Sequence, residues 1–113
     1  MNKIRKPGQG GFIAVGEVVI DLPPTKMELF ELLLNAYEQD KDMPPEMRGW
    51  RSAKEIIPEL FYPVEVESLR RAVSIINKKF KQASQRLGLD PLAVLIESKR
   101  GIGYRLKYLF DQE

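Results

Sequence analysis

Residues 65–87 read EVESLRRAVSIINKKFKQASQRL, and their apolar side chains recur at steps of three and four. This spacing places them in one narrow stripe, which is typical of an α-helix that buries one side. The stripe consists of Leu69, Val73, Ile76, Phe80, Ala83 and Leu87. We expect a helix from about Glu65 to Leu87, ended by Gly88 in a left-handed C-terminal cap.

The side of this helix opposite the stripe is polar and cationic. Arg70 and Asn77 flank it at one edge, and Ile75 and Lys79 flank it at the other. The side chains between these edges are Glu67, Arg71, Ser74, Lys78, Lys81 and Gln85. An α-helix fits the major groove of DNA, where such side chains contact base edges and phosphates. The alternative interpretation is an ordinary amphipathic helix with a solvated, lysine-rich face.

Two shorter helices are predicted before the long one. Thr25–Glu28 and Ser52–Glu55 match the capping box, in which a hydroxyl and a carboxylate three residues later cap the start of a helix. The first helix should run from about Lys26 to Gln39. The second should run from the second box to about Phe61, with Pro58 ending or kinking it early.

The segments around these helices predict strands, loops and an arm. Residues 1–11 are polar, basic and glycine-rich, so we expect a flexible basic arm there and one folded domain over residues 12–113. β-Branched runs at Phe12–Val15 and Glu17–Leu22 predict one or two short strands. Residues 40–51 contain two prolines and a glycine and should form a loop, whose Trp50 either packs on the core or is exposed to a partner.

A glycine-containing turn follows the long helix. Lys99–Gly103 is predicted to join two strands, and the second strand, Tyr104–Tyr108, alternates apolar and polar residues. Lys99 and Arg100 would lie at the tip of this hairpin, and Arg105 on its second strand. The hairpin therefore provides cations that could bind the same partner as the long helix.

Composition narrows the classes of function. The 113 residues include no Cys and no His, which excludes thiol nucleophiles, disulfides and the usual zinc ligands. No apolar run approaches the ~20 residues that span a bilayer. Residues 17–65 hold five basic and eleven acidic side chains, whereas residues 66–107 hold ten basic and three acidic ones. This asymmetry favours a polyanion-binding face in the second half, and we expect neither catalysis nor a metal nor another cofactor.

The hairpin also carries a family resemblance. Ile96–Leu106, IESKRGIGYRL, resembles the end of the winged-helix DNA-binding domain of OmpR/PhoB-type response regulators, which reads strand, basic residue, Arg-Gly-x-Gly-Tyr-Arg, apolar residue. Asp21–Leu33, Ser52–Ile57 and Val73–Phe80 are similar to the family's first helix, second-helix start and recognition helix. The resemblance covers about residues 17–108. It implies an α+β fold, a three-helix winged helix-turn-helix with a short N-terminal β element and a C-terminal hairpin wing, in a bacterial, cytoplasmic, nucleoid-associated protein.

Three departures from the family pattern matter. The family has arginines where this chain has Ile75 and Asn77, so Arg70 or Arg71 would have to substitute in base readout. The link at residues 62–65 is brief where a longer family loop contacts RNA polymerase, so recruitment by that route is not expected. These 113 residues contain no counterpart of the family's receiver domain, so the chain is either a single-domain protein or an excised effector domain, and from Met1 and its short arm we expect the first.

Together these patterns predict a transcriptional regulator that binds double-stranded DNA with a sequence preference. The predicted base readers are Arg70, Arg71, Ser74 and Asn77, and the predicted phosphate contacts are Lys78, Lys81, Lys99 and Arg105. Arg100 would approach the minor groove. One such module buries only about 600–1,000 Å², so we expect two copies on adjacent half-sites.

Two other interpretations stay open at this point. The domain could bind a protein through an exposed apolar patch formed by Met47, Trp50 and Tyr62, with the basic helix face merely solvated. It could instead bind nucleic acid by structure in replication or recombination, with the wing carrying most of the binding and little base preference.

Overall fold

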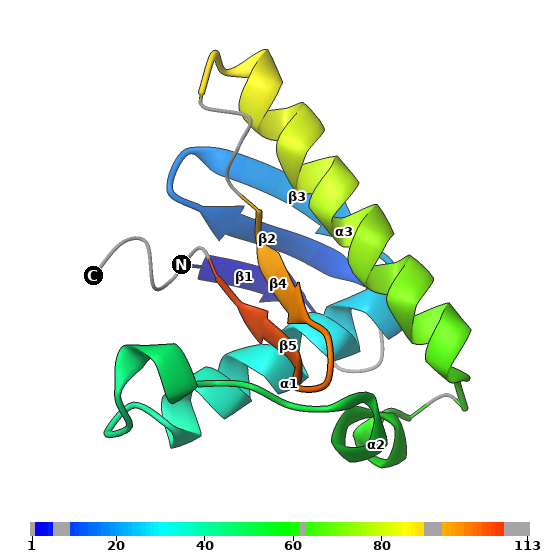
Figure 1. Ribbon diagram of the computed structural model, residues 1–113. Helices are drawn as coiled ribbons and strands as arrows, with labels where there is room; N and C mark the ends of the chain where they lie inside the picture. Colours follow the sequence, from blue (N-terminus) through cyan, green and yellow to red (C-terminus); the bar gives the residue numbers. More distant parts are fainter. Residues whose placement is uncertain (1, 6–9, 62, 90–93, 108–113) are drawn as a thin grey trace.

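Helices and two antiparallel sheets make up an α+β fold (Figure 1). The computed structural model describes residues 2–5, 10–61, 63–89 and 94–107. The α-helices in these residues are α1 (Pro24–Gln39), α2 (Ala53–Ile56) and α3 (Val66–Arg86), with 3-10 turns η1 (Pro45–Met47) and η2 (Ile57–Glu59). The strands are β1 (Asn2–Arg5), β2 (Gly11–Val15), β3 (Val18–Leu22), β4 (Ile96–Lys99) and β5 (Gly103–Leu106).

The N-terminal sheet has the order β1-β2-β3, and all its pairs are antiparallel. Alternate residues of β2 and β3 face inward, so that Ile13, Val15, Val18, Ile20 and Leu22 are buried. The prediction of a flexible arm is wrong for residues 2–5, which form β1 against β2 with Asn2 opposite Ala14. A four-residue edge strand needs only backbone hydrogen bonds to the neighbouring strand, so no apolar alternation marks it in the sequence.

α1 begins earlier than predicted and without the expected cap. Pro23 is its N-cap residue, Pro24 is its first residue, and no side chain caps the helix. Proline suits the first helical position because its missing N–H needs no partner there. The predicted Thr25–Glu28 box is therefore wrong. Glu28 Oε2 instead accepts a hydrogen bond of 2.9 Å from the N–H of Phe61, which ties α1 to the segment after η2.

α2 confirms the second capping box. The N–H of Glu55 donates to Ser52 Oγ at 3.2 Å, and the N–H of Ser52 donates to Glu55 Oε1 at 3.0 Å. The helix ends at Ile56 and continues as η2, which contains Pro58. The early end at Pro58 is thus confirmed, because proline supplies no N–H to continue the helix.

α3 lies within one residue of its predicted bounds. Leu69, Val73, Ile76 and Phe80 are buried as expected. The last turn of the helix differs from the prediction, because Leu87 is 50% exposed and Ser84 is buried in its place. Ser84 Oγ donates a hydrogen bond of 2.8 Å to the Phe80 carbonyl. This end of α3 extends past the sheets (Figure 1), so no core remains there for Leu87 to enter. Gly88 has a φ of +71°, which confirms the left-handed cap.

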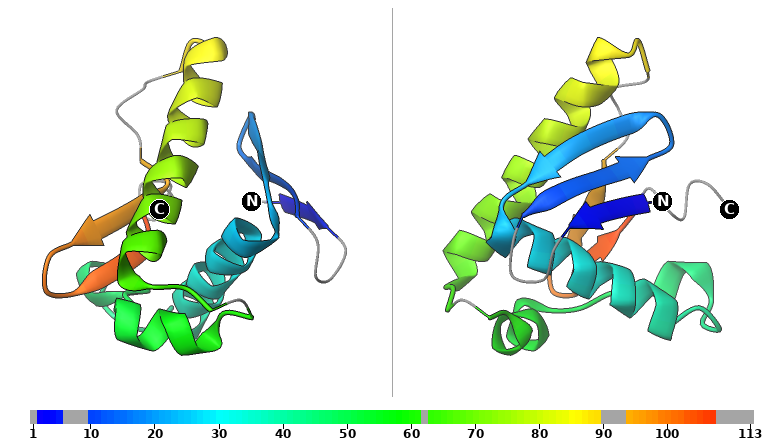
Figure 2. Two further views of the ribbon diagram at one scale, coloured as in Figure 1. Left: turned by 90° about the vertical axis from the view of Figure 1, so that its right-hand side faces the viewer. Right: turned by 180° about the vertical axis from the view of Figure 1, so that it is seen from behind.

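The core lies between the helices and both sheets. Figure 2 shows the N-terminal sheet and the β4–β5 hairpin on opposite sides of α1 and α3. Phe30 of α1 and Phe80 of α3 are almost fully buried in one cluster with residues of both sheets, including Leu106 of β5. In the described part of the chain, no helix is both long and apolar enough to cross a bilayer.

An ion pair at the ends of the predicted loop holds residues 40–51 in place. Arg51 Nη1 lies 2.8 Å from Asp40 Oδ2, and the N–H of Gly49 donates to the same oxygen at 3.0 Å. The hydrogen bond from the Arg51 guanidinium is the largest cause that lowers the pKa of Asp40 below its usual value. The carboxylate is therefore a structural group that closes the loop onto the end of α1.

This pair predicts a pH dependence of stability. Asp40→Asn is expected to lower the free energy of unfolding at pH 7 by about 1–2 kcal/mol, because it removes a hydrogen bond to a charged group. The pair's contribution is present above the unfolded aspartate pKa of about 3.9 and is lost as the pH falls through the lower folded-state pKa. Urea unfolding from pH 7 to pH 2 should therefore show the two proteins converging in acid. A difference that stays constant across this range would contradict the assignment, and Asp42→Asn, in the same loop but exposed, is the control.

Candidate nucleic-acid interface

A groove of about 860 Å³ lies between the N-terminal half of α3 and the tip of the β4–β5 hairpin. Arg70 and Ser74 line it from α3, and Lys99 and Arg100 line it from the hairpin turn. Among the described residues that line the groove, three are cationic and none is acidic. Cations from two elements far apart in the sequence thus share one concave surface.

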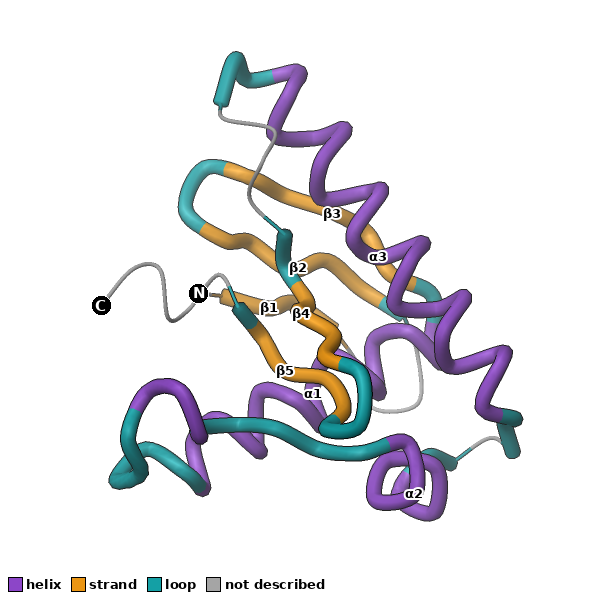
Figure 3. The backbone as a smooth tube through the Cα atoms, viewed as in Figure 1, coloured by secondary structure: helices purple, strands orange, loops and turns teal. Residues whose placement is uncertain are grey.

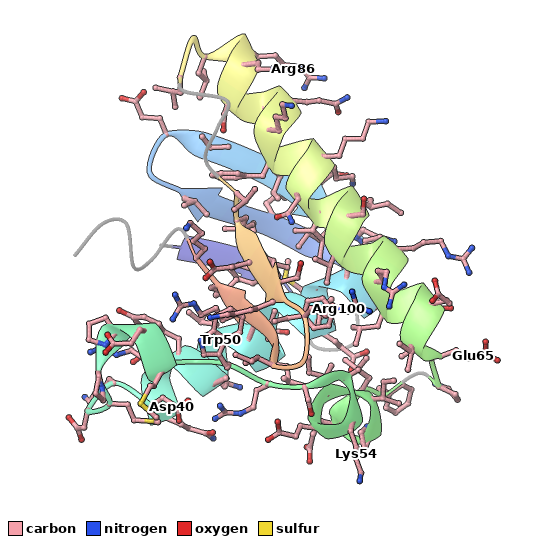
Figure 4. All side chains as sticks on the ribbon, viewed as in Figure 1. Asp40, Trp50, Lys54, Glu65, Arg86 and Arg100 are labelled. Carbon is pink, nitrogen blue, oxygen red and sulfur yellow. The ribbon has the colours of Figure 1, made fainter. Side chains whose placement is uncertain are left out.

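The hairpin turn has the predicted form. Lys99 pairs with Gly103, the N–H of Ile102 donates to the Lys99 carbonyl at 3.0 Å, and Gly101 has a φ of +82°. Lys99 and Arg100 are both exposed. Figure 4 shows Arg100 on the side of the hairpin that faces α3. The last residue of the predicted second strand, Tyr108, lies outside the described residues.

The hairpin is also fixed to the segment before α2. The N–H of Arg51 donates to the Tyr104 carbonyl at 3.0 Å, and the N–H of Tyr104 donates to the Arg51 carbonyl at 2.9 Å. Figure 3 shows this segment passing beside the hairpin on its way to α2. A β-carbon on Gly103 would lie 2.2 Å from the Arg51 carbonyl oxygen, so only glycine allows this approach.

The remaining predicted cations of α3 are exposed but lie outside the groove. Lys78 and Lys81 are exposed on the helix surface. Arg71 is exposed too, but it lines a separate cavity of about 350 Å³ that also borders Lys26 and Ile75.

Arg70 lies at the groove with its guanidinium 3.1 Å from Glu67, and both side chains are about two-thirds exposed at 66% and 65%. Ion pairs this exposed are weak, so Arg70 can exchange Glu67 for another anion.

Asn77 also lines the groove, but it is half-buried and its carboxamide is bonded to the hairpin. Its Nδ2 donates to the Ile96 carbonyl at 2.9 Å, and the N–H of Ile96 donates to its Oδ1 at 2.8 Å. Both polar atoms of the carboxamide are therefore engaged by the backbone of β4. Asn77 lies at the edge of the buried stripe that faces the hairpin, so we interpret it as a structural contact in the free protein and not as a base reader.

Arg105 is likewise corrected from a phosphate contact to an anchor. Its side chain is only 12% exposed, and its Nε lies 2.7 Å from Glu97 Oε1. Nη1 donates to the carbonyls of Pro45 at 2.7 Å and Arg48 at 3.3 Å. Glu97 and Arg105 are direct cross-strand partners in the hairpin register, and counting outward from the turn would have found this pair.

Trp50 completes this anchor. The Arg105 guanidinium lies 4.5 Å from the centre of the indole ring, within the range of a cation–π contact, and Trp50 Nε1 donates to the Glu46 carbonyl at 3.0 Å. Trp50 is therefore half-buried against Arg105, which matches neither predicted state fully, since it is neither part of the core nor freely exposed. Met47 is 55% exposed, and Tyr62, the third residue of the apolar patch considered above, lies outside the described residues.

Comparisons of this chain with protein-family models, with curated proteins and with solved structures find no match. In the described residues, no three carboxylates gather as a metal site would require. The strongest local feature is the groove that joins Arg70 and Ser74 to Lys99 and Arg100.

Proposed function

We propose that the chain is a winged-helix domain that binds double-stranded DNA with a sequence preference and regulates transcription. The single observation that carries this proposal is the groove between α3 and the hairpin, where three cations and no carboxylate are among the described lining residues. DNA presents a high density of phosphates, and a protruding helix flanked by a cationic hairpin matches its alternating grooves.

The arrangement of the elements supports this assignment. A helix pair is followed by the long α3 and then by the hairpin, and the segment at Arg51 forms a bridge to the hairpin at Tyr104. This order agrees with the resemblance to the OmpR/PhoB-type winged-helix domain. Such a regulator would act in the bacterial cytoplasm, with two copies on adjacent half-sites supplying the specificity that one small module lacks.

The assignment of roles changes from the sequence-based one at two residues. We place α3 in the major groove, with Arg70, Arg71 and Ser74 at base edges and with Lys78 and Lys81 at phosphates. The hairpin then acts as the wing, with Lys99 on the backbone and Arg100 at the minor groove. Asn77 and Arg105 leave the interface because their polar atoms are bonded within the protein.

Fluorescence anisotropy with random-sequence duplex DNA at several salt concentrations tests the proposal. The three lysines placed at phosphates and Arg100 at the minor groove together correspond to a log–log salt slope of about −3.6 for each bound copy. Selection of the bound duplexes then separates a regulator, which enriches a motif, from a binder that recognises structure alone. If no binding occurs even at about 50 mM salt, the proposal is wrong, and the loop with the exposed Met47 becomes the candidate surface for a protein partner.

Removal of the hairpin cations should weaken this binding specifically. The double variant Lys99→Ala/Arg100→Ala is expected to reduce the salt slope by about 2, because Lys99 neutralises a phosphate and Arg100 brings a second cation into the minor groove, where it also displaces a counterion. The matched control is Lys41→Ala/Lys54→Ala, which removes the same charge from exposed positions outside the groove. Equal slopes for the two double variants would mean that only the net charge matters, and the wing would have no role.

A further inference from the structure

We propose that Asn77 is a positioning residue, which sets the angle between α3 and the β4–β5 hairpin and thereby the spacing of their two DNA contacts. The structural half of this inference stands on the geometry of the free protein. The half that concerns DNA rests on the proposed function.

The Asn77 carboxamide substitutes for a neighbouring strand. β4 pairs with β5 along one edge, with Ile96 opposite Leu106. At its other edge, the N–H and carbonyl of Ile96 meet Oδ1 and Nδ2 of Asn77 at 2.8 and 2.9 Å. A carboxamide supplies one acceptor and a donor in the same plane, which matches a backbone edge. Neither a charged lysine nor an arginine at this position could accept the N–H.

The pairing lies at the base of the groove. Ser74 and Arg70 lie one and two turns before Asn77 on α3, on the side that lines the groove. Lys99 lies three residues beyond Ile96 along β4, about 10 Å away at the rise of a strand. A change of angle at Asn77 and Ile96 therefore moves the hairpin cations relative to α3.

Removal of this pairing leaves the hairpin attached elsewhere. Tyr104 remains bonded to the Arg51 backbone, and Arg105 remains bonded to Glu97 and to the loop carbonyls. We therefore expect a variant of Asn77 to fold, with a hairpin whose angle to α3 is no longer fixed. The folding of the variant and the position of its hairpin relative to α3 can then be measured separately.

Amide hydrogen exchange in the free protein tests the pairing. Asn77→Ala is expected to speed the exchange of the Ile96 amide by about tenfold or more, because this buried N–H loses its acceptor, whereas the Tyr104 amide should be unchanged. Gln82→Ala, at an exposed position of α3, is the matched control. If the alanine variant does not fold, Asn77→Asp decides. It keeps an acceptor for the Ile96 N–H, so its Ile96 amide should exchange at close to the wild-type rate, and exchange about tenfold faster would overturn the inference. An unchanged Ile96 amide in Asn77→Ala would overturn the inference.

A double-mutant cycle tests positioning. If Asn77 places the hairpin, Arg100→Ala should weaken DNA binding by about tenfold in the wild-type background and by less than about twofold in the Asn77→Ala background, because coupled residues are not additive. Arg71→Ala is the control, since Arg71 is on α3 itself and should cost the same in both backgrounds. Additive losses for Arg100 would overturn positioning while leaving the proposed function intact. Failure of the wild type to bind DNA would overturn the proposed function, and the exchange of Ile96 would still decide the pairing.

Discussion

Arg105→Ala is expected to lower the free energy of unfolding by about 2–3 kcal/mol, because it breaks a largely buried charge pair and several hydrogen bonds at once. The substitution removes the bonds to Glu97 and to the carbonyls of Pro45 and Arg48, together with the stacking on Trp50. Urea unfolding followed by far-UV circular dichroism measures the loss of stability, and Trp50 fluorescence should respond in the same transition. The loop 40–51 would no longer be attached to the hairpin through this side chain.

Arg100→Ala is the matched control for this prediction. Both residues are arginines of the same hairpin, but Arg100 is exposed at the turn, whereas the Arg105 side chain is 12% exposed. A substitution at the exposed site should change stability by no more than about 0.5 kcal/mol. The two variants should therefore separate, with Arg105 affecting stability and Arg100 affecting only the proposed DNA binding. Equal stability losses would contradict the assignment of Arg105 as an anchor.

Gly103→Ala is expected to have the largest effect on stability, about 3 kcal/mol or more, because backbone strain and a steric clash act together. Gly103 has a φ of +138°, and an added β-carbon would lie 2.2 Å from the carbonyl oxygen and 2.6 Å from the carbonyl carbon of Arg51. Both obstacles are backbone atoms, which cannot move aside without breaking the bridge between Arg51 and Tyr104. Thermal unfolding and the exchange of the Tyr104 amide measure the effect.

Gly101→Ala separates strain from clash. Gly101 also has a positive φ, +82°, but a β-carbon there would meet no atom within 4 Å. We expect a cost of about 1 kcal/mol from the left-handed backbone alone. If Gly101→Ala proves as destabilising as Gly103→Ala, the close approach of the hairpin to Arg51 is not what requires glycine at residue 103.

The helices were predictable where local signals agreed. The apolar stripe and Gly88 predicted α3 within one residue, and Ser52 with Glu55 predicted the start of α2. At α1 two local signals competed. Thr25 matched a capping box, but the Pro23-Pro24 pair began the helix before it, because proline at the first helical position needs no cap for its nitrogen.

Elements that depend on distant partners were not predictable in this way. β1 exists because the edge of β2 offers backbone hydrogen bonds, which a polar sequence can accept as well as an apolar one. The end of the buried stripe moved from Leu87 to Ser84 because the core stops before α3 does. Neither fact has a local signature in the residues concerned.

The candidate site, like the fold, has features that the local sequence predicted and features that depend on distant contacts. Residue types and their spacing were enough to predict a helix with a cationic face. They were also enough to predict a glycine-containing turn with two cations, and both elements lie where they were expected. Tertiary contacts decided which of the predicted polar side chains remain available to bind DNA. The β4 backbone binds Asn77, and carbonyls of the loop bind Arg105. Helical period and turn chemistry act over a few residues, whereas the hydrogen-bond partner of a half-buried side chain is set by segments that only folding brings within 3 Å.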